Sequence, residues 1–448
     1  MPTWSLWRKR SRPVQSEWQG NLKDTQEYMA KMYVRISSVA LFMIAMAPFA
    51  SAFSVYAPFP LLIATFALGF RWPPAPLWVK FTLIWIVVFF HLDSTGTLIN
   101  LMSLVVADLG TFAFASIVSD QGLEIAIRRI SKMSIWTILL SLPASIFLAV
   151  PLDLANPITD ILVGGRLRLL SGSNTGHSVA LELAAIAIVG ILCGALRFLL
   201  WPLVVYFLGT ALYLSGSLTG GLILVATVGG SLIERAPRFG LLVHLAMISG
   251  IMWFINDPEG ANKFIGGFRL MVGQDPSNYA GDFSAGRALL NSLLTDLANQ
   301  SPLTGVGHEH QTLTYGVRIV TGEQTGANSE SPLRLAAQYG WPLFLLTFAL
   351  SAMPLVMGLT SSGLFRRFFI PMGYVVLITG STNGELISVG QSSAYILMWP
   401  IVWLAYIFWK PLFIIRILPE RFMHMRKSSD MRNPFLVKLS GERTHVRY

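Results

Sequence analysis

Long apolar runs separated by short polar stretches make up most of this chain. Runs of roughly 17 to 25 apolar residues are long enough to cross about 30 Å of bilayer hydrocarbon as helices. We identify about twelve such runs, at residues 34–52, 54–70, 77–92, 97–117, 134–151, 178–195, 197–213, 217–233, 239–255, 335–358, 367–380 and 391–409. The pattern therefore predicts an all-α polytopic membrane protein.

The composition supports the same class. Hydrophobic residues make up 53% of the 448 positions and charged residues 12%, whereas soluble domains carry about 25% charged residues. The single cysteine, Cys193, lies inside an apolar run. This excludes an internal disulfide and a thiolate metal cluster, so we expect helix packing alone to hold the fold.

Basic residues predict which side of the membrane each loop occupies, because cytoplasmic loops retain Lys and Arg. They are dense before residue 34, after residue 409 and around alternate loops. In the loops these markers are Arg71, Lys80, Arg128, Arg129, Lys132, Arg197, Arg235, Arg238, Arg366 and Arg367. Both termini are therefore predicted to be cytoplasmic, and the net charge of +10 reflects topology, so no nucleic-acid partner is expected.

The resulting organisation has five parts. A cytoplasmic tail covers residues 1–33, and the first nine spans lie within 34–255. One large polar segment, residues 256–333, is placed outside the cytoplasm between spans nine and ten. Residues 334–409 hold the last three spans, and a basic cytoplasmic tail covers 410–448. A hydrophilic insert of this size, set after many spans, is the expected place for function.

Within the large segment, residues 286–300 carry leucines at helical spacing. Leu289, Leu290, Leu293, Leu294 and Leu297 follow an i, i+3, i+4 pattern, which predicts an amphipathic helix. Such a helix either lies on the bilayer or caps the bundle. A Pro-Leu-Thr-Gly-Val-Gly turn at 302–307 follows it.

A second group of polar residues precedes the sixth span. Arg166, Arg168, Asn174 and His177 lie at the predicted outer membrane surface. Arginines there could bind a phosphate through forked donors, or could only anchor the chain at the interface. Glu182 lies just inside the span, where burial of a carboxylate is expensive and suggests a polar cavity or a pairing with one of the arginines.

His308-Glu309-His310 and Glu330 are the titratable candidates of the large segment. Ligands at i, i+2 share a face only in an extended strand, and no third ligand of matching spacing is near, so no metal is expected. His308 is either a titratable acid or base at the bilayer surface or a solvated loop residue. Glu330 either only stabilises the N-terminus of the following helix, through the helix dipole, or has a chemical role.

The order of these motifs resembles the O-antigen ligase and polysaccharide polymerase family. The likeness rests on Gly286-Arg287 heading the leucine-rich stretch, the 302–307 turn, and Ser-Glu-Ser-Pro-Leu-Arg-Leu at 329–335 followed by Tyr339-Gly340. It extends to Arg-Leu-Arg-Leu-Leu-Ser-Gly-Ser-Asn at 166–174, and to the layout of about twelve spans with the insert between the ninth and tenth. It covers the whole chain in layout, while each motif is degenerate.

The resemblance implies a helical, lipid-donor glycosyltransferase architecture of the GT-C-like type in the bacterial inner membrane. Such enzymes transfer a glycan from undecaprenyl pyrophosphate to an acceptor glycan on the periplasmic side, with no cofactor. Arg287 matches the family arginine proposed to grip the pyrophosphate, and Arg166 sits where another family arginine often does. Two features depart from the ligases: Ser329-Glu330 stands at their His-Asn pair, and Ser217-Leu218 at their Ser-Arg.

We therefore expect a repeat-unit polymerase for an exported polysaccharide that acts without a metal. Glu330 is the first candidate base and His308 the second, with Arg287, Arg166, Arg168, Asn174, His177 and Arg334 as donor-binding or glycan-binding residues. Chain-length or export proteins are possible partners. The alternatives are an O-antigen ligase acting on a lipid A-core acceptor, a polysaccharide transporter or flippase, and a non-catalytic assembly factor.

Overall fold

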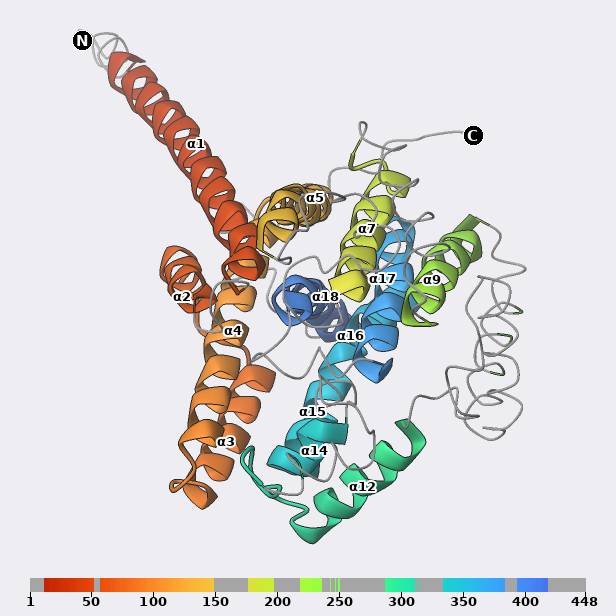
Figure 1. Ribbon diagram of the computed structural model, residues 1–448. Helices are drawn as coiled ribbons and strands as arrows, with labels where there is room; N and C mark the ends of the chain where they lie inside the picture. The colour runs from red at the N-terminus through yellow and green to blue at the C-terminus, as the bar shows by residue number, and fades with distance from the viewer. Residues whose placement is uncertain are drawn as a thin grey trace, which may run out of the picture.

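The computed structural model describes residues 12–51, 57–148, 176–196, 218–235, 287–310, 333–382 and 393–417, together with positions 242, 246, 249 and 313. Apart from turns and caps, these residues are helical, and no strand occurs among them (Figure 1). The helices are α1 (Arg12–Ser51), α2 (Pro58–Leu68), α3 (Ala75–Phe90), α4 (Thr95–Ser119), α5 (Leu123–Leu148), α7 (Gly176–Leu192), α9 (Leu218–Arg235), α12 (Arg287–Gln300), α14 (Leu333–Tyr339), α15 (Trp341–Ser351), α16 (Met353–Thr360), α17 (Gly363–Thr382) and α18 (Ser393–Ile417).

Within the described residues, three helical stretches are long and apolar enough to cross a membrane, namely Lys31–Pro48, Thr95–Ser119 and Trp341–Thr360. Shorter apolar helices accompany them, at Pro58–Leu68, Ala75–Phe90, Leu181–Leu192, Leu222–Leu232 and Tyr395–Trp409. We therefore treat the chain as an integral membrane protein. The predicted runs at 197–213 and 239–255 lie outside the described residues, apart from positions 242, 246 and 249.

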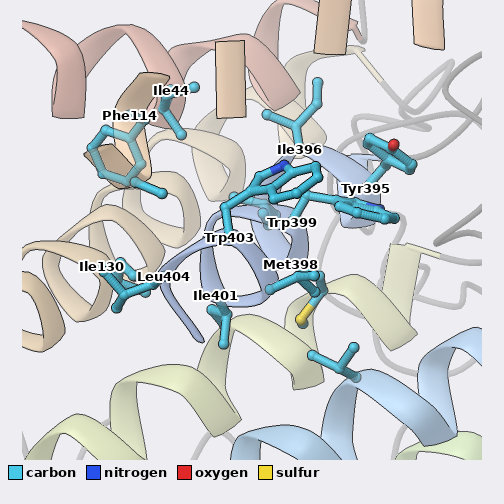
Figure 2. Close-up of a cluster of buried hydrophobic side chains, with 14 of the residues drawn as sticks. Ile44, Phe114, Ile130, Tyr395, Ile396, Met398, Trp399, Ile401, Trp403 and Leu404 are labelled. Atoms are coloured by element: carbon cyan, nitrogen blue, oxygen red, sulfur yellow. The ribbon is translucent and has the colours of Figure 1, made fainter. Parts of the chain in front are cut away.

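Helix α18 lies at the centre of the bundle and carries a stripe of large aromatic side chains. Tyr395, Trp399 and Trp403 recur every four residues and are fully buried (Figure 2). The rings of Tyr395 and Trp399 stack with their centroids 5.0 Å apart. Phe112 of α4 meets the Trp403 ring edge-on at 5.8 Å. Because spacing of four places side chains on one helical face, α18 packs this face against its neighbours, including α4.

The predicted tenth span is interrupted. Residues 333–339 form the separate helix α14, and α15 begins only at Trp341. Gly340 separates the two helices with φ of +91°, a left-handed conformation that ends an α-helix. The membrane-crossing stretch thus starts six residues later than the apolar run at 335–358 predicted, and α14 belongs structurally to the preceding polar segment.

One assignment made from charge is corrected, and the structure adds the conformation of the N-terminal tail. Lys80 was counted as a cytoplasmic loop marker, but it lies within α3 and is fully buried. Its Nζ atom is 2.9 Å from Oδ2 of Asp108 in α4, so its charge is compensated by pairing and gives no information on topology. The predicted N-terminal tail is helical from Arg12 onward, because α1 continues without a break from the tail into the first span.

Candidate functional site

Three segments far apart in the sequence meet at one end of the bundle; the first two are predicted to lie outside the cytoplasm, and the third falls at the outer end of the predicted tenth span. They are the α3–α4 turn at 91–97, the turn after α12 at 301–310, and the α14–α15 junction at 337–341. In Figure 1 this region lies at the bottom, where the turn after α12 meets the α3–α4 turn.

Main-chain hydrogen bonds join the second and third segments. The N–H groups of Val306 and Gly307 donate to the carbonyl oxygens of Ala337 and Gln338, at 2.8 and 3.0 Å. The Trp341 N–H donates to the carbonyl oxygen of Pro302 at 2.9 Å. Each bond satisfies a backbone group near the end of α14 or the start of α15, where helices leave such groups without an internal partner.

Glycine is required on both sides of this contact. Gly305 has φ of +69°, and a Cβ there would lie 2.2 Å from the carbonyl carbon of Gln338. Gly340 has φ of +91°, and a Cβ there would lie 2.3 Å from the carbonyl oxygen of Leu303. Both positions combine left-handed backbone with contact closer than any side chain allows. The Gly-rich turn is thus explained by close backbone approach.

Helix α12 packs against α14. Its apolar face buries Leu294, Leu297 and Ala298 against Ala336 and Ala337 of α14. At its C-terminal end, the Asn299 side-chain oxygen accepts a hydrogen bond from Trp341 Nε1 at 3.1 Å. The amphipathic helix therefore covers the end of the bundle, which is the second of the two arrangements that its pattern allows.

The N-terminus of α4 is tied to the turn after α12. Ser94 is the N-cap, and its Oγ accepts a hydrogen bond from the Thr97 N–H at 3.2 Å. Oγ1 of Thr97 accepts the backbone N–H of His308 at 2.9 Å. The Glu309 carboxylate accepts the Gly96 N–H at 2.7 Å, a position where the helix dipole also favours a negative charge.

A histidine of the α3–α4 turn contributes one more contact. Nε2 of His91, the C-cap residue of α3, lies 3.2 Å from the carbonyl oxygen of Thr304. A Cβ at Gly307 would lie 3.2 Å from Nδ1 of the same ring. His91 is therefore held between two residues of the Gly-rich turn, and both ends of the α3–α4 turn contact the segment that carries His308.

Gln338 connects the two predicted site residues that the structure brings together, His308 and Arg334. Its amide is assigned so that the oxygen faces the donors around it. Oε1 then accepts from Nε and Nη2 of Arg334, at 2.9 and 3.3 Å, and from Nδ1 of His308, at 3.1 Å. Gln338 is 5% exposed. One buried amide oxygen thus orients a guanidinium and an imidazole toward the same point.

This arrangement determines which His308 nitrogen can act as a base. With the proton on Nδ1 donated to Gln338, the lone pair of the neutral ring is on Nε2. Within the described residues Nε2 has no hydrogen-bond partner. Burial lowers the pKa of His308 below 6.5, the positive charge of Arg334 lowers it further, and Glu309 opposes both effects. His308 is therefore a neutral imidazole at pH 7.

Arg334 provides the positive charge of the site. It forms no ion pair with any carboxylate in the described part of the chain. Burial lowers the pKa of its guanidinium below its usual range, but a guanidinium remains charged at neutral pH. A partly buried guanidinium favours an anionic partner, and its forked donors match a phosphate or carboxylate.

The other predicted site residues are not brought into this cluster by the described structure. Arg166, Arg168, Asn174 and Glu330 lie outside the described residues. His177 lies in the first turn of α7, where only the backbone is described. Arg287 begins α12. A helix of this length spans about 20 Å, so Arg287 stands at the far end of α12 from the turn that carries His308.

Sequence reasoning did not identify Gln338 or the α3–α4 turn. Gln338 follows Arg334 by four positions, which is one helical turn, so the two residues share a face of α14. That spacing is the signal that could have found it. Ser94 and Thr97 carry the ordinary pattern of a helix N-cap, and nothing in that pattern indicates contact with a segment more than 200 positions away.

No group of three or more potential metal ligands occurs among the described residues. Comparison of the chain with protein-family models, with curated proteins and with solved structures gives no match in any of the three. The class supported by the structure is therefore an all-helical membrane protein with a polar cluster of histidine, glutamine and arginine at one end of its bundle.

Proposed function

We propose that the chain is a membrane glycosyltransferase that polymerises lipid-linked repeat units on the periplasmic side, as the resemblance to the O-antigen ligase and polymerase family suggests. The observation that carries the proposal is Gln338 holding both a neutral His308 and the Arg334 guanidinium through one amide oxygen. An inverting transfer from a pyrophosphate donor needs a base for the acceptor hydroxyl and a cation for the leaving group. The cluster provides one of each.

The chemistry assigned to the cluster balances without a further reactant. The acceptor hydroxyl oxygen attacks the anomeric carbon of the donor glycan, and its proton passes to Nε2 of His308. The bond from the anomeric carbon to the pyrophosphate oxygen breaks, and its electron pair leaves with the pyrophosphate. Arg334 stabilises the charge that develops there. Gln338 is a positioning residue, because it holds both groups without touching the reacting atoms.

This proposal gives His308 the role of base ahead of Glu330. The reason is geometric, since the His308 ring has a fixed donor at Nδ1 and, among the described residues, an acceptor without a partner at Nε2. Arg287 stands at the far end of α12 from His308, so in this arrangement it binds a more distant part of the lipid-linked donor, and Arg334 is the cation at the pyrophosphate. Arg166 and Arg168 remain candidates for pyrophosphate binding from the resemblance.

The buried charges in α3 and α4 bear on the alternative of a transporter or flippase. Transport proteins carry charged groups deep in the membrane, lining a path for substrate or ions. Lys80 and Asp108 are deep, but each is fully buried and they neutralise one another. A sealed pair of this kind is explained by helix packing, so these residues do not favour transport over glycosyl transfer.

The test is chain extension on lipid-linked repeat units by membranes containing variants. His308→Gln is expected to abolish extension, and Arg334→Gln to raise KM for the lipid donor and lower kcat. His310→Gln is the matched control, because it replaces the neighbouring histidine of the same turn, and it should retain activity. Chain extension at the wild-type rate by His308→Gln would show that His308 is not the base. Glu330→Gln, tested in parallel, decides between the two candidate bases.

Glycan length in a deletion strain separates the alternatives. Loss of a polymerase leaves single repeat units on the surface, and loss of a flippase abolishes the surface polymer. Loss of a ligase leaves polymer that is not attached to its lipid anchor. The proposal would be supported if the deletion strain carries single units and the wild-type gene, but not His308→Gln, restores long chains. Unattached polymer would instead show a ligase.

A further inference from the structure

A buried polar network joins α3, α4 and α18 deep in the bundle. Lys80 Nζ lies 2.9 Å from Oδ2 of Asp108 and donates a hydrogen bond to the Tyr395 hydroxyl at 2.9 Å. The Tyr395 hydroxyl in turn donates to Oδ1 of Asp108. The ammonium group also sits 4.2 Å from the centre of a Trp399 ring, within cation–π range. All four residues are fully buried.

Helix α3 has little else to hold it at one height in the membrane. Its opposite face is broadly exposed and, apart from Thr82, apolar. That face consists of Trp78, Val79, Trp85, Ile86, Phe89 and Phe90. Lipid tails are as apolar as these side chains, so burial of apolar surface does not favour one axial position over another. A polar contact in an apolar surrounding does favour one axial position, because sliding α3 by one turn would leave two charges unpaired.

The position of the ion pair along the two helices is symmetric about the α3–α4 turn. Lys80 lies eleven positions before His91, and Asp108 lies eleven positions after Thr97. Each is about 16 Å from the turn along its own helix. The pair therefore sets the register of the α3–α4 hairpin and thereby the height at which the turn stands.

The turn contacts the candidate site directly. His91 approaches the Thr304 carbonyl at 3.2 Å, and Thr97 accepts the His308 backbone N–H at 2.9 Å. Two hydrogen bonds of ordinary length cannot both form if α3 or α4 shifts by a fraction of a turn. The register of the hairpin and the placement of His308 are thus mechanically connected.

We infer that Lys80, Asp108 and Tyr395 are positioning residues that hold the α3–α4 turn against the segment carrying His308. The inference rests on the proposed function for its effect on catalysis, but its structural part does not. The network fixes α3 relative to α4 and α18, and the turn transmits that register to the His308 backbone. A change in the network should therefore alter the site without any change to a residue that touches substrate.

The structural part can be tested without activity, by disulfide formation between positions 96 and 309. A Cβ at Gly96 would lie 3.0 Å from Cγ of Glu309, which places the two Cβ atoms within disulfide reach of about 4.5 Å or less. Gly96→Cys and Glu309→Cys are introduced together with Cys193→Ala, which removes the native thiol. Disulfide yield is measured by gel shift on protein that elutes as a folded species in detergent.

Lys80→Met in this background is expected to lower the disulfide yield severalfold, and the exchange of both charges, Lys80→Asp with Asp108→Lys, is expected to restore it. Tyr395→Phe keeps the ion pair and removes one hydroxyl. If Lys80→Met does not fold, the disulfide yield of Tyr395→Phe provides the test, and a lower yield is expected. Thr82→Ala, on the exposed face of α3, is the matched control and should leave the yield unchanged. Wild-type yield in folded Lys80→Met or Tyr395→Phe protein would overturn the inference.

The catalytic part is tested separately, with all native residues at positions 96 and 309. Lys80→Met and Tyr395→Phe should lower kcat for chain extension by about tenfold or more, with KM for the lipid donor nearly unchanged, because Arg334 remains in place. An unchanged kcat beside a reduced disulfide yield would overturn the link to catalysis. A reduced yield in a protein whose wild type extends no chains would refute the proposed function and leave the positioning role intact.

Discussion

Gln338→Met is the most direct perturbation of the candidate site. Methionine has nearly the length and volume of glutamine, so the buried position remains filled while the amide oxygen is lost. That oxygen accepts two hydrogen bonds from the Arg334 guanidinium and one from the His308 imidazole. The variant thus removes the group that orients both the proposed base and the proposed cation, with no change to either.

The size of the effect follows from the kind of bond lost. Hydrogen bonds to charged groups contribute about 1.5–3 kcal/mol, more than neutral ones. If that contribution is expressed in the transition state, kcat/KM for chain extension falls by about 10- to 150-fold, since 1.36 kcal/mol corresponds to a factor of ten. The loss should appear mainly in kcat, because the freed guanidinium still carries its charge.

The assay measures initial rates of chain extension with purified lipid-linked repeat units over a range of donor concentrations and pH. Asn299→Ala is the matched control, because it removes a side-chain amide that bonds Trp341 in the same layer and touches neither His308 nor Arg334. Gln338→Glu keeps an acceptor and adds a negative charge. The charge raises the pKa of His308 and moves the acid limb of the pH–rate profile to higher pH. A Gln338→Met rate equal to that of Asn299→Ala would refute the reasoning.

Three further outcomes are expected. The acid limb of the kcat/KM profile should lie below 6.5, because burial and Arg334 both lower the pKa of His308; Arg334→Gln should move it upward, and a limb that stays in place would contradict the assignment. Gly340→Ala should lower the thermal unfolding temperature in detergent, at a cost of about 1–3 kcal/mol for strained backbone, because its Cβ would meet the Leu303 carbonyl. Gly363→Ala, also at positive φ but without neighbours within 4 Å, is the control and should cost less. Ser94→Ala should destabilise α4 by about 1 kcal/mol through loss of its N-cap, measured by the same melt, and an unchanged melt would exclude that role.

Much of the helical layout could be predicted from hydrophobic periodicity. The described helices from α1 to α5, together with α7, α9, α17 and α18, each cover most of an apolar run. Helix α12 covers the leucine-patterned stretch. Such runs are visible in the sequence because each helix must bury or expose its own side chains along its own length. The boundary at Gly340 was missed, because apolarity continues through the break and only the backbone conformation separates α14 from α15.

The candidate site was predictable only in part. His308 and Arg334 were singled out by residue type and by their place in the polar segment, but nothing in the sequence indicated that they meet. Gln338 brings them together through one amide oxygen. Its role depends on the packing of the 301–310 turn against the α14–α15 junction, which is a contact between segments some thirty positions apart.

The sequence by itself determined the class of the protein and the approximate extent of its helices, because hydrophobicity and charge act on each segment independently of the others. Only the tertiary structure decided which polar groups are paired. Lys80 illustrates the difference, since one lysine within an apolar run reads equally well as a loop marker or as a buried cation. Its pairing with Asp108 and Tyr395, from helices 28 and 315 positions away, decides the matter. Burial of a charge depends on its partner, and a partner is a property of the fold.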